Sequence, residues 1–289
     1  MTLEINSPGK INLTLRITGS RKDGMHEIAS LFMRLPALER LTLRTIHENN
    51  VKGDLVRVHG QEVKGRNILE AVLTAAREKE PQLPFIEVHI WKQVPPGSGL
   101  GSGSGNAAAL ASWMSREWSV EFSVEELAEI GSDVPFLFQG DGLSFMTGIG
   151  EQPLEKIEGA AGLFKVVIVI PAWTCSTPVM YKMADEFYRK KGWKLNGYEA
   201  YDEALDILES LKKQERIGLL PNDFVPVLEA TRPGYRLLLA AAEDGGALAW
   251  GVSGSGSAFF CLFGRDAPGF SRTELFEETG IARKILILG

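Results

Sequence analysis

The chain has 289 residues, of which 44% are hydrophobic and 24% charged, a composition that excludes global disorder and a fibrous repeat. Its length predicts two domains or one large one. The net charge of −6 argues against a broad nucleic-acid surface and against an anionic-membrane binder, so an anionic ligand must be held by local groups such as backbone amides.

The first half of the chain alternates strand and helix patterns. Regular alternation of polar and apolar residues predicts strands, and apolar residues at helical spacing predict helices. Asn67 is a plausible N-cap, and Ser123 begins a capping box. The expected strands are 10–17, 39–44, 54–58 and 85–91, and the expected helices are 67–78, 107–118 and a short one that follows 123.

The second half predicts a β-α-β-β-α-β order, which is typical of a split βαβ sandwich. Its first strand is a continuous run of β-branched residues and is therefore expected to be buried. We place the domain boundary between residues 160 and 161, in a linker at 158–162. The expected strands are 164–170, 247–252, 258–263 and 282–288, and the expected helices are 178–189, 199–212, 236–243 and 271–279.

Signals for metal binding, disulfides and targeting are negative. Cys175 and Cys261 lie far apart without CxxC spacing, which predicts two free thiols in a reducing cytosol. The four histidines show no metal-ligand spacing, so no dedicated metal site is expected. The N-terminus lacks the features of a signal peptide, and no apolar run approaches the ~18 residues of a spanning helix. We therefore expect a soluble cytoplasmic protein.

Glycine is over-represented, at 31 residues or about 11% against an average near 7%. Five glycines occupy every second position of 97–105, between a predicted strand and a predicted helix. Glycine allows positive φ and close approach of a ligand to the backbone. A helix that starts near 104–107 would direct its free amides and positive dipole end into this loop. The segment therefore predicts an anion cradle, most plausibly for a polyphosphate.

Other readings of this loop are less consistent with its residues. A Walker loop ends in Gly-Lys-Ser/Thr, whereas Ser104-Gly105-Asn106 supplies no lysine. The dinucleotide fingerprint GxGxxG fails because its third glycine is absent. A flexible Gly/Ser linker usually lacks the flanking strand and the Ala-rich helix found here.

The loop and six further segments resemble those of the GHMP-superfamily small-molecule kinases, whose phosphate loop has the form PxxxGLGS/GS-x-AA. The resemblance covers essentially the whole chain. It implies an α+β, two-domain fold with an N-terminal ribosomal protein S5 domain 2-like domain (1–160) and a C-terminal ferredoxin-like split βαβ domain (161–289). The matching segments are 7–28, 95–108, 131–138, 148–151, 176–181, 222–223 and 253–258.

The resemblance implies that the chain is an enzyme that uses ATP with Mg²⁺. Lys92 and Asn67 are weaker nucleotide-site candidates, for which surface or capping roles stay open. The expected ATP-binding residues are Pro95, Pro96, Gly97, Ser98, Gly99, Leu100, Gly101, Ser102, Gly103, Ser104, Gly105, Lys92 and Asn67.

Phosphoryl transfer to an alcohol needs positioning, charge neutralisation and a group that takes the hydroxyl proton. Asp133 is the candidate for that proton, in Gly-Ser-Asp-Val-Pro at the predicted entry to an apolar strand; a helix-end or turn aspartate is the structural alternative. The match of residues 8–13 to the family's PAKINL segment implies Lys10 and Asp133 as the active pair. Whether Asp133 acts as a full base or mainly as an electrostatic anchor stays open.

More narrowly, the chain resembles the branch that phosphorylates the 2-hydroxyl of 4-(cytidine 5′-diphospho)-2-C-methyl-D-erythritol in the non-mevalonate isoprenoid pathway. The family places the second glycine cluster, 251–258, beside the phosphate loop and uses the histidine of its GYH motif against cytosine. The tyrosine of that motif is methionine here, and a second aromatic would supply the other stacking face, worth roughly 1–3 kcal/mol. The expected substrate-binding residues are Asn12, Met25, His26, Tyr181, Gly254 and Ser255.

Three departures from the family pattern keep alternatives open. Met25 leaves a GHMP kinase of another specificity possible, for mevalonate, homoserine or a sugar. Gly105 replaces a small hydroxyl residue, and the segment between Leu127 and Asp133 is shorter by roughly four residues, about one helical turn. These two departures motivate a nucleotide-binding homologue with weakened catalysis. As partners we expect ATP and a small molecule but neither nucleic acid nor membrane, with a monomer or homodimer as the working form.

Overall fold

The computed structural model describes residues 2–46, 53–60, 65, 67–140, 142–157, 162–189, 192, 195–265, 267 and 273–288. The chain forms two compact units, and each draws on several segments. Unit 1 comprises Met1–Lys10, Arg34–Pro96 and Gly101–Gly140, and unit 2 comprises Ile11–Met33, Gly97–Leu100 and Asp141–Gly289. The linker predicted at 158–162 lies, apart from Gly162, outside the described residues, so the domain boundary stays a prediction.

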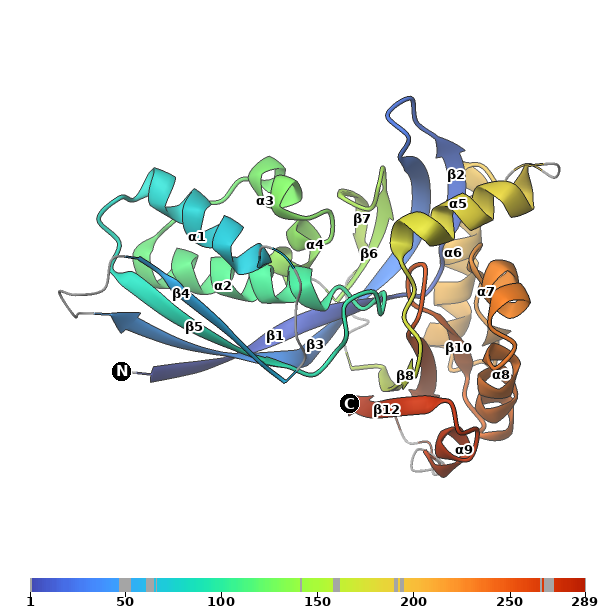
Figure 1. Ribbon diagram of the computed structural model, residues 1–289. Coiled ribbons are helices and arrows are strands. Elements are labelled where there is room, and N and C mark those ends of the chain that lie inside the picture. The colour runs from blue at the N-terminus through green and yellow to red at the C-terminus, as the bar shows by residue number, and fades with distance from the viewer. Residues whose placement is uncertain are drawn as a thin grey trace. The chain divides into compact units, whose positions relative to one another are not determined.

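Unit 1 is a sheet with helices on one face (Figure 1). In the sheet, β5 lies between parallel β4 and antiparallel β3, and β1 also pairs with β3, which continues into unit 2. The strands are β1 Thr2–Asn12, β3 His26–Ile46, β4 Leu55–Gly60 and β5 Phe85–Lys92, and the helices are α1 Ile68–Lys79, α2 Ser102–Trp118, α3 Val124–Ile130 and α4 Val134–Gln139.

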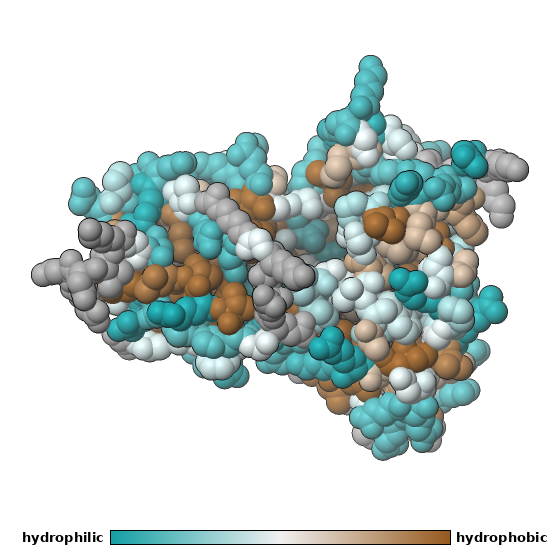
Figure 2. All heavy atoms as spheres, in the orientation of Figure 1, coloured by the Kyte–Doolittle hydropathy of each residue, from teal (hydrophilic) through white to brown (hydrophobic). Residues whose placement is uncertain are grey.

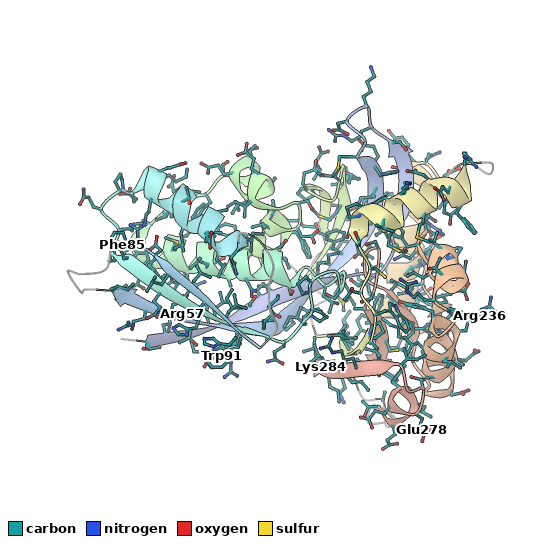
Figure 3. The ribbon with its side chains drawn as sticks, in the orientation of Figure 1. Arg57, Phe85, Trp91, Arg236, Glu278 and Lys284 are labelled. Carbon is teal, nitrogen blue, oxygen red and sulfur yellow. The ribbon has the colours of Figure 1, made fainter. Side chains whose placement is uncertain are left out.

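Side chains of β5 alternate between the two faces of this sheet, as a strand period of two requires. Ile86, Val88 and Ile90 are buried, whereas Trp91 is exposed. Trp91 and Arg57 point away from α1 and α2 (Figure 3). The upper edge of the unit, over α1 and α3, is mostly hydrophilic, and apolar side chains reach the surface over β4 and β5 (Figure 2). One face of the sheet therefore forms a core with the helices.

Unit 2 contains an antiparallel sheet in the order β12-β8-β11-β10, which β9 extends by pairing parallel to β10. Helices α7 and α8 cover one face (Figure 1). The order β8-helices-β10-β11-α9-β12 confirms the predicted split βαβ topology. The strands are β8 Phe164–Pro171, β9 Gly218–Leu219, β10 Ala249–Val252, β11 Phe259–Gly264 and β12 Ala282–Leu288, and the helices are α5 Thr177–Tyr188, α6 Gly197–Lys212, α7 Val225–Thr231, α8 Tyr235–Asp244 and α9 Glu274–Glu277.

The rest of unit 2 is built on the first part of β3. That part pairs with β2 (Arg16–Ser20) and with β6 (Leu143–Thr147), and β6 pairs in turn with β7 (Gln152–Ile157). Apolar residues from this early segment, Leu15, Ile17 and Ile28, belong to the same buried cluster as Val167 and Val169 of β8.

A buried ion cluster also joins the early and late parts of unit 2. Asp223 is fully buried, and its Oδ1 accepts a 2.8 Å hydrogen bond from Arg16 Nη1. The Asp223 Oδ2 accepts another from the Ile17 amide at 2.9 Å. The Arg16 guanidinium also donates to Glu203 from Nε and Nη2. Because a buried carboxylate is costly without such partners, the two chain segments depend on each other.

Several sequence predictions need correction. The predicted strand 10–17 is divided, because β1 ends at Asn12 and β2 begins at Arg16. Residues 134–139 form helix α4 rather than a strand, and Pro135 in its first turn fits a helix start, where no amide is needed. Helix α2 begins at Ser102, several residues before the predicted start, so Gly103 and Gly105 are helical. The predicted N-cap at Asn67 and the capping box at Ser123 are confirmed.

Negative findings apply to the described residues alone. Among them no helix has the length and hydropathy required to cross a bilayer. The same part of the chain holds no group of three or more His, Cys, Asp or Glu residues arranged to bind a metal ion. Both cysteines are buried free thiols.

Glu87, on the outer face of β5, gives unit 1 a pH-dependent stability. Hydrogen bonds from Arg44 and Arg57 hold the pKa of its carboxyl at about 2, below the ordinary 4.5. A carboxyl with a lowered pKa stabilises the fold above its unfolded pKa, and this contribution disappears as pH falls through the folded pKa. We expect Glu87→Gln to be less stable than wild type at about pH 7, and this difference to shrink between about pH 4.5 and 2. Denaturant unfolding across that range is the measurement, and a constant difference would contradict it.

Candidate active site

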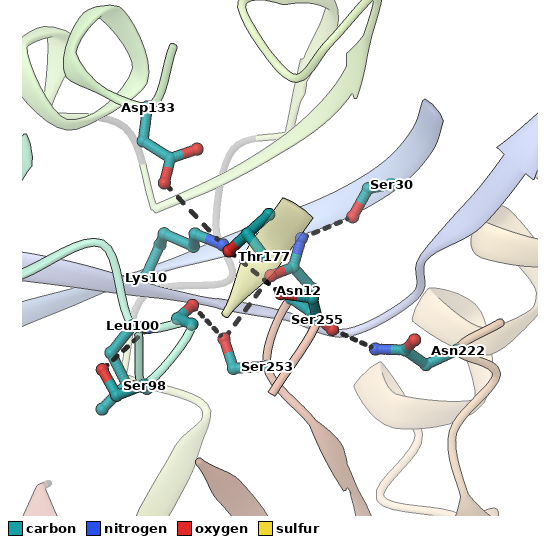
Figure 4. Close-up of polar contacts among 12 residues, drawn as sticks. Lys10, Asn12, Ser30, Ser98, Leu100, Asp133, Thr177, Asn222, Ser253 and Ser255 are labelled. Atoms are coloured by element: carbon teal, nitrogen blue, oxygen red, sulfur yellow. Dashed lines mark hydrogen bonds and ion pairs between the residues drawn. The ribbon is translucent and has the colours of Figure 1, made fainter. Parts of the chain in front are cut away.

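Lys10 and Asp133 meet in unit 1, although they are 123 positions apart in the sequence. Lys10, near the end of β1, is buried, and its Nζ lies 3.9 Å from Asp133 Oδ2 (Figure 4). Asp133 occupies the N-cap position of α4, but within the described residues its side chain makes no capping bond there. Burial lowers the pKa of the Lys10 ammonium, and the charge of Asp133 opposes this effect. The shortened segment before Asp133 therefore does not separate the pair.

The pair lies against the start of α2. Gly101, the N-cap residue, has a left-handed φ of 62°. A Cβ on Gly101 would stand 3.2 Å from Lys10 Cγ and 3.3 Å from Asp133 Oδ2. Gly101 has no side chain to cap α2, so amides of the first turn are available to a ligand. The geometry combines an ammonium, a carboxylate and the positive end of a 17-residue helix.

Gly105, where the family has a small hydroxyl residue, packs closely against β1. In α2 it faces the β1 backbone, and a Cβ there would lie 1.7 Å from the Pro8 carbonyl oxygen. The helix therefore has no space for a hydroxyl side chain at this position. By contrast, a Cβ on Gly103, in the first turn of α2, would meet no described atom within 4 Å beyond its chain neighbours and the helix's own backbone.

Lys92 is buried below the first turn of α2 and is not a surface lysine. Its Nζ donates to Glu39 Oε2 at 2.8 Å and to Ser102 Oγ at 2.7 Å. Asn106 donates from Nδ2 to the same carboxylate oxygen at 3.0 Å. Glu39 was not among the predicted site residues. In the sequence, the one indication of its role is that an acidic residue occupies a position where the alternating pattern of β3 predicts a buried side chain.

In unit 2, the middle of the glycine loop packs against the second glycine cluster. The Ala258 amide donates to Ser98 O at 2.8 Å, and Ser253 Oγ donates to Gly99 O at 2.8 Å. A Cβ on Gly99 would lie 1.9 Å from Ser253 O, and its φ is +79°. The expected close approach of the two glycine segments is therefore present, as a contact between backbones.

Asn12 belongs to a polar network in unit 2 (Figure 4). Its Nδ2 donates to Ser30 Oγ at 2.9 Å, and its Oδ1 accepts from Ser253 Oγ at 3.4 Å. Asn222 donates to the carbonyls of Val252 and Gly254, both at 3.0 Å, and so fixes the second glycine cluster. The match of residues 222–223 to the family indicated that Asn222 has a role in the site. It did not indicate that the side chain donates to the carbonyls of Val252 and Gly254.

The remaining Gly254 and Ser255 lie in this fixed cluster. Gly254 has φ +60°, and a Cβ there would lie 3.6 Å from Asn12 Oδ1. Ser255 Oγ donates to Thr177 Oγ1, at the start of α5, at 3.2 Å. Gly254 therefore lies beside Asn12, and Ser255 lies beside the start of α5, both within unit 2.

His26 and Tyr181, the residues expected to face a base, lie against each other in unit 2. Their rings stack with centroids 4.6 Å apart and planes at 22°. His26 Nε2 also lies 2.7 Å from Asp185 Oδ1, one turn further along α5. Met25, in contrast, is 48% exposed. The Asp185 contact was not predicted, since it joins residues 159 positions apart.

The other predicted nucleotide residues are less informative. Asn67 accepts a 3.0 Å hydrogen bond from the Leu69 amide, which is the capping role. Pro95 is buried and Pro96 is exposed before the loop turns at Gly97, whose carbonyl accepts from the Ser257 amide at 3.1 Å. Leu100 is fully buried, and Ser104 follows Gly103 in the first turn of α2. Their contacts with a ligand stay predictions.

Known proteins provide an independent comparison. Family models for the GHMP kinases match the chain at residues 67–145 (N-terminal domain) and 204–275 (C-terminal domain). The 4-diphosphocytidyl-2-C-methyl-D-erythritol kinase of Leptospira interrogans is 32% identical over 274 residues, 89% of this chain and 90% of that protein. The kinase of the same name from Salinispora arenicola is 32% identical over 270 residues, 90% of this chain and 82% of that protein.

Solved structures agree on the fold. A crystal structure of a 4-(cytidine 5′-diphospho)-2C-methyl-D-erythritol kinase superposes with a TM-score of 0.78 and 24% identity, covering 99% of this chain and 98% of that one. A homoserine kinase from Cytophaga hutchinsonii reaches 0.68 with 16% identity, covering 100% and 94%. The α+β, two-domain GHMP fold expected from the sequence is therefore confirmed. From its matched domains, its relatives and its fold, the chain belongs to the GHMP kinases, which transfer phosphate from ATP to small molecules.

Proposed function

We propose that this kinase phosphorylates the 2-hydroxyl of 4-(cytidine 5′-diphospho)-2-C-methyl-D-erythritol, in the non-mevalonate route to isoprenoid precursors. The observation that carries the proposal is the Lys10–Asp133 pair at the glycine-rich start of α2. Relatives with the corresponding name at 32% identity support this acceptor.

Amides at the start of α2 are proposed to hold the ATP phosphates. The open space beside Gly103 and the positive helix end fit a polyphosphate. Mg²⁺ is proposed to arrive on the nucleotide, since the described residues contain no cluster that would bind it independently. Bound there, Mg²⁺ would neutralise charge on the phosphate oxygens.

Asp133 is proposed to accept the proton of the acceptor hydroxyl. As that oxygen forms its bond to the γ-phosphorus, the bond from phosphorus to the bridging oxygen breaks and its electron pair leaves with ADP. Lys10, whose ammonium lies beside Asp133, is proposed to orient the carboxylate and to offset negative charge on the transferred group.

The acceptor is proposed to bind through Asn12, Gly254, Ser255, His26 and Tyr181. If a cytosine enters between the stacked rings of His26 and Tyr181, the two rings would have to separate. If the cytosine stays outside, it would stack on the outer face of one ring. The exposed Met25 provides a flexible apolar side chain where the family has an aromatic ring. Weaker stacking is therefore expected to raise the KM for the acceptor.

The proposal also covers the location, the oligomeric state and the domain boundary of the enzyme. The enzyme is proposed to work in the cytoplasm as a monomer or homodimer. Its domains are proposed to divide between residues 160 and 161, and no nucleic acid or membrane is expected to take part.

An acceptor panel tests the proposed activity. Purified protein, Mg²⁺ and ATP would be incubated with the cytidine-diphospho acceptor, mevalonate, homoserine and a sugar, and ADP and phosphorylated products would be measured. Product from the cytidine compound alone, carrying phosphate on its 2-hydroxyl, supports the proposal. Turnover of only an acceptor without cytosine points to the other GHMP specificities, and ATP binding without any turnover points to a homologue that has lost catalysis.

Gly103→Ala separates ligand binding from stability. An alanine in a helix is favoured over glycine by about 0.5–1 kcal/mol. Beyond the chain neighbours and the helix's own backbone, no described atom lies within 4 Å of the new methyl group. We therefore expect the unliganded variant to be at least as stable as wild type, while its KM for ATP rises because the methyl group occupies phosphate space. Thermal unfolding and ATP saturation curves are the measurements. An unchanged KM for ATP would argue against phosphate at this turn.

A further inference from the structure

The carboxylate of Glu39, in β3, is fully buried and receives four hydrogen bonds. Its Oε1 accepts from the backbone amides of Gln93 at 3.0 Å and Val94 at 2.9 Å. Its Oε2 accepts from Lys92 Nζ at 2.8 Å and from Asn106 Nδ2 at 3.0 Å. A carboxylate with this many donors is held in one orientation.

These donors lie on both sides of the glycine loop. Gln93 and Val94 come directly before Pro95, where the chain leaves β5, and Asn106 belongs to the start of α2. Lys92 extends the connection, because its ammonium also donates to Ser102 Oγ at 2.7 Å, at the first residue of α2. Glu39 therefore joins the entry of the loop to the helix whose amides the loop leads into.

The charges make this arrangement sensitive to substitution. The side chains of Glu39 and Lys92 are 0% and 5% exposed. A buried ion pair adds little net stability, but removing one partner leaves an uncompensated charge and is strongly unfavourable. In Glu39→Gln, the new NH2 group would face two donors in either orientation of the amide, namely Lys92 and Asn106 or the two backbone amides. The residues at both ends of the loop would have to move to relieve this conflict.

We infer that Glu39 is a positioning residue for ATP, which sets the α2 amides through Lys92, Ser102 and Asn106 without touching the nucleotide. The inference rests on the proposed binding of ATP phosphates at the start of α2. Because such amides act only at hydrogen-bond distance, small displacements of the helix start reduce affinity.

The matched control is a second ion pair of unit 1. Asp54 accepts from Arg77 Nε and Nη2, both at 2.6 Å, and from the Ile86 amide at 2.8 Å. It thus ties α1 to β5 much as Glu39 ties β5 to α2, but within the described part of the chain it makes no hydrogen bond or ion pair with residues 93–106. Asp54→Asn reports what the loss of a structural carboxylate does by itself.

The first experiment measures the dissociation constant of a fluorescent ATP analogue, which needs no acceptor. We expect Glu39→Gln to weaken binding about tenfold or more, whereas Asp54→Asn changes it less than about twofold. Melting temperatures of both variants show whether they lose comparable stability. Steady-state kinetics should show the same split, with a raised KM for ATP and a nearly unchanged KM for the acceptor.

The double variant Glu39→Gln/Lys92→Met tests the charge argument and covers the case in which Glu39→Gln does not fold. Removing the lone ammonium should restore much of the stability, and nucleotide binding should be tighter than in the single variant. Analogue binding within about twofold of wild type in Glu39→Gln, or equal weakening in Asp54→Asn, would overturn the inference. If neither single variant can be purified, a double variant that binds like wild type would overturn it as well.

The outcomes also separate this inference from the proposed activity. Wild-type protein that binds the analogue but leaves the cytidine acceptor unchanged disproves the acceptor assignment, while the comparison of Glu39 and Asp54 variants still decides the positioning role. Wild-type protein that does not bind the analogue at all disproves both.

Discussion

Asp133→Asn should slow phosphoryl transfer by about 10²- to 10⁴-fold, the usual contribution of a positioned acid–base group, with little change in nucleotide affinity. Asn keeps the shape of the side chain but takes up no proton and carries no charge. The rate of ADP formation at saturating ATP and acceptor measures phosphoryl transfer, and binding of a fluorescent ATP analogue measures nucleotide affinity. Asp54→Asn, which removes a carboxylate from the same unit, should keep near wild-type turnover.

The pH profile of the variant distinguishes a base from an electrostatic anchor. Burial lowers the pKa of Lys10, and the charge of Asp133 opposes this. Without that charge, the pKa of Lys10 falls further and the ammonium loses its proton at a lower pH. If Asp133 acts mainly by keeping Lys10 charged, lost activity should partly return as pH decreases. If it is the base, activity should stay low at every pH, and near-wild-type turnover would contradict both roles.

Gly105→Ala should strongly destabilise the protein. The new Cβ would overlap the Pro8 carbonyl oxygen at 1.7 Å, and a backbone atom cannot move aside as a flexible side chain can. Overpacking typically costs about 1–3 kcal/mol, and a clash between two backbones is expected at or above the upper end. Urea unfolding of the unliganded protein gives the free energy directly.

Gly103→Ala is the control for this prediction, since the two glycines lie two residues apart in α2. The same methyl group meets open space at 103 and the β1 backbone at 105. We therefore expect opposite signs for the two changes in unfolding free energy. Equal effects would mean that the approach of α2 to β1 does not require glycine. The absence of the family's hydroxyl at 105 would then need another explanation.

The sequence identifies elements whose signals are local. Asn67 and Ser123 mark helix starts because their side chains bond within the next turn, so spacing alone reveals them. The run 134–138 was misread because a short, continuous apolar run has no distinctive period. Pro135 in the first turn was the available signal for a helix. The early start of α2 was missed because glycine is a poor helix former, and its tolerance here comes from packing against Pro8.

For the site, the resemblance to the family's PAKINL segment implied Lys10 and Asp133 as a pair, and the two side chains lie within ion-pair distance. The pairings of Glu39 with Lys92 and of His26 with Asp185 were not predicted. The paired residues are 53 and 159 positions apart. Whether they meet depends on how distant strands and helices align, and no local sequence pattern encodes that alignment. A buried acidic residue becomes interpretable only when its donors are known.

Unit 2 is built from separate segments of the chain, and this limits how relatives of this enzyme can be recombined. A chimera that takes its second half, from residue 161 onward, from another parent would place a foreign Asp223 counterpart against this chain's Arg16 and Ile17. It would also fit a foreign β8 surface against Leu15 and Ile28. Crossover sites that keep residues 11–33 with the second half should therefore yield more folded hybrids than a single junction at the predicted boundary between residues 160 and 161.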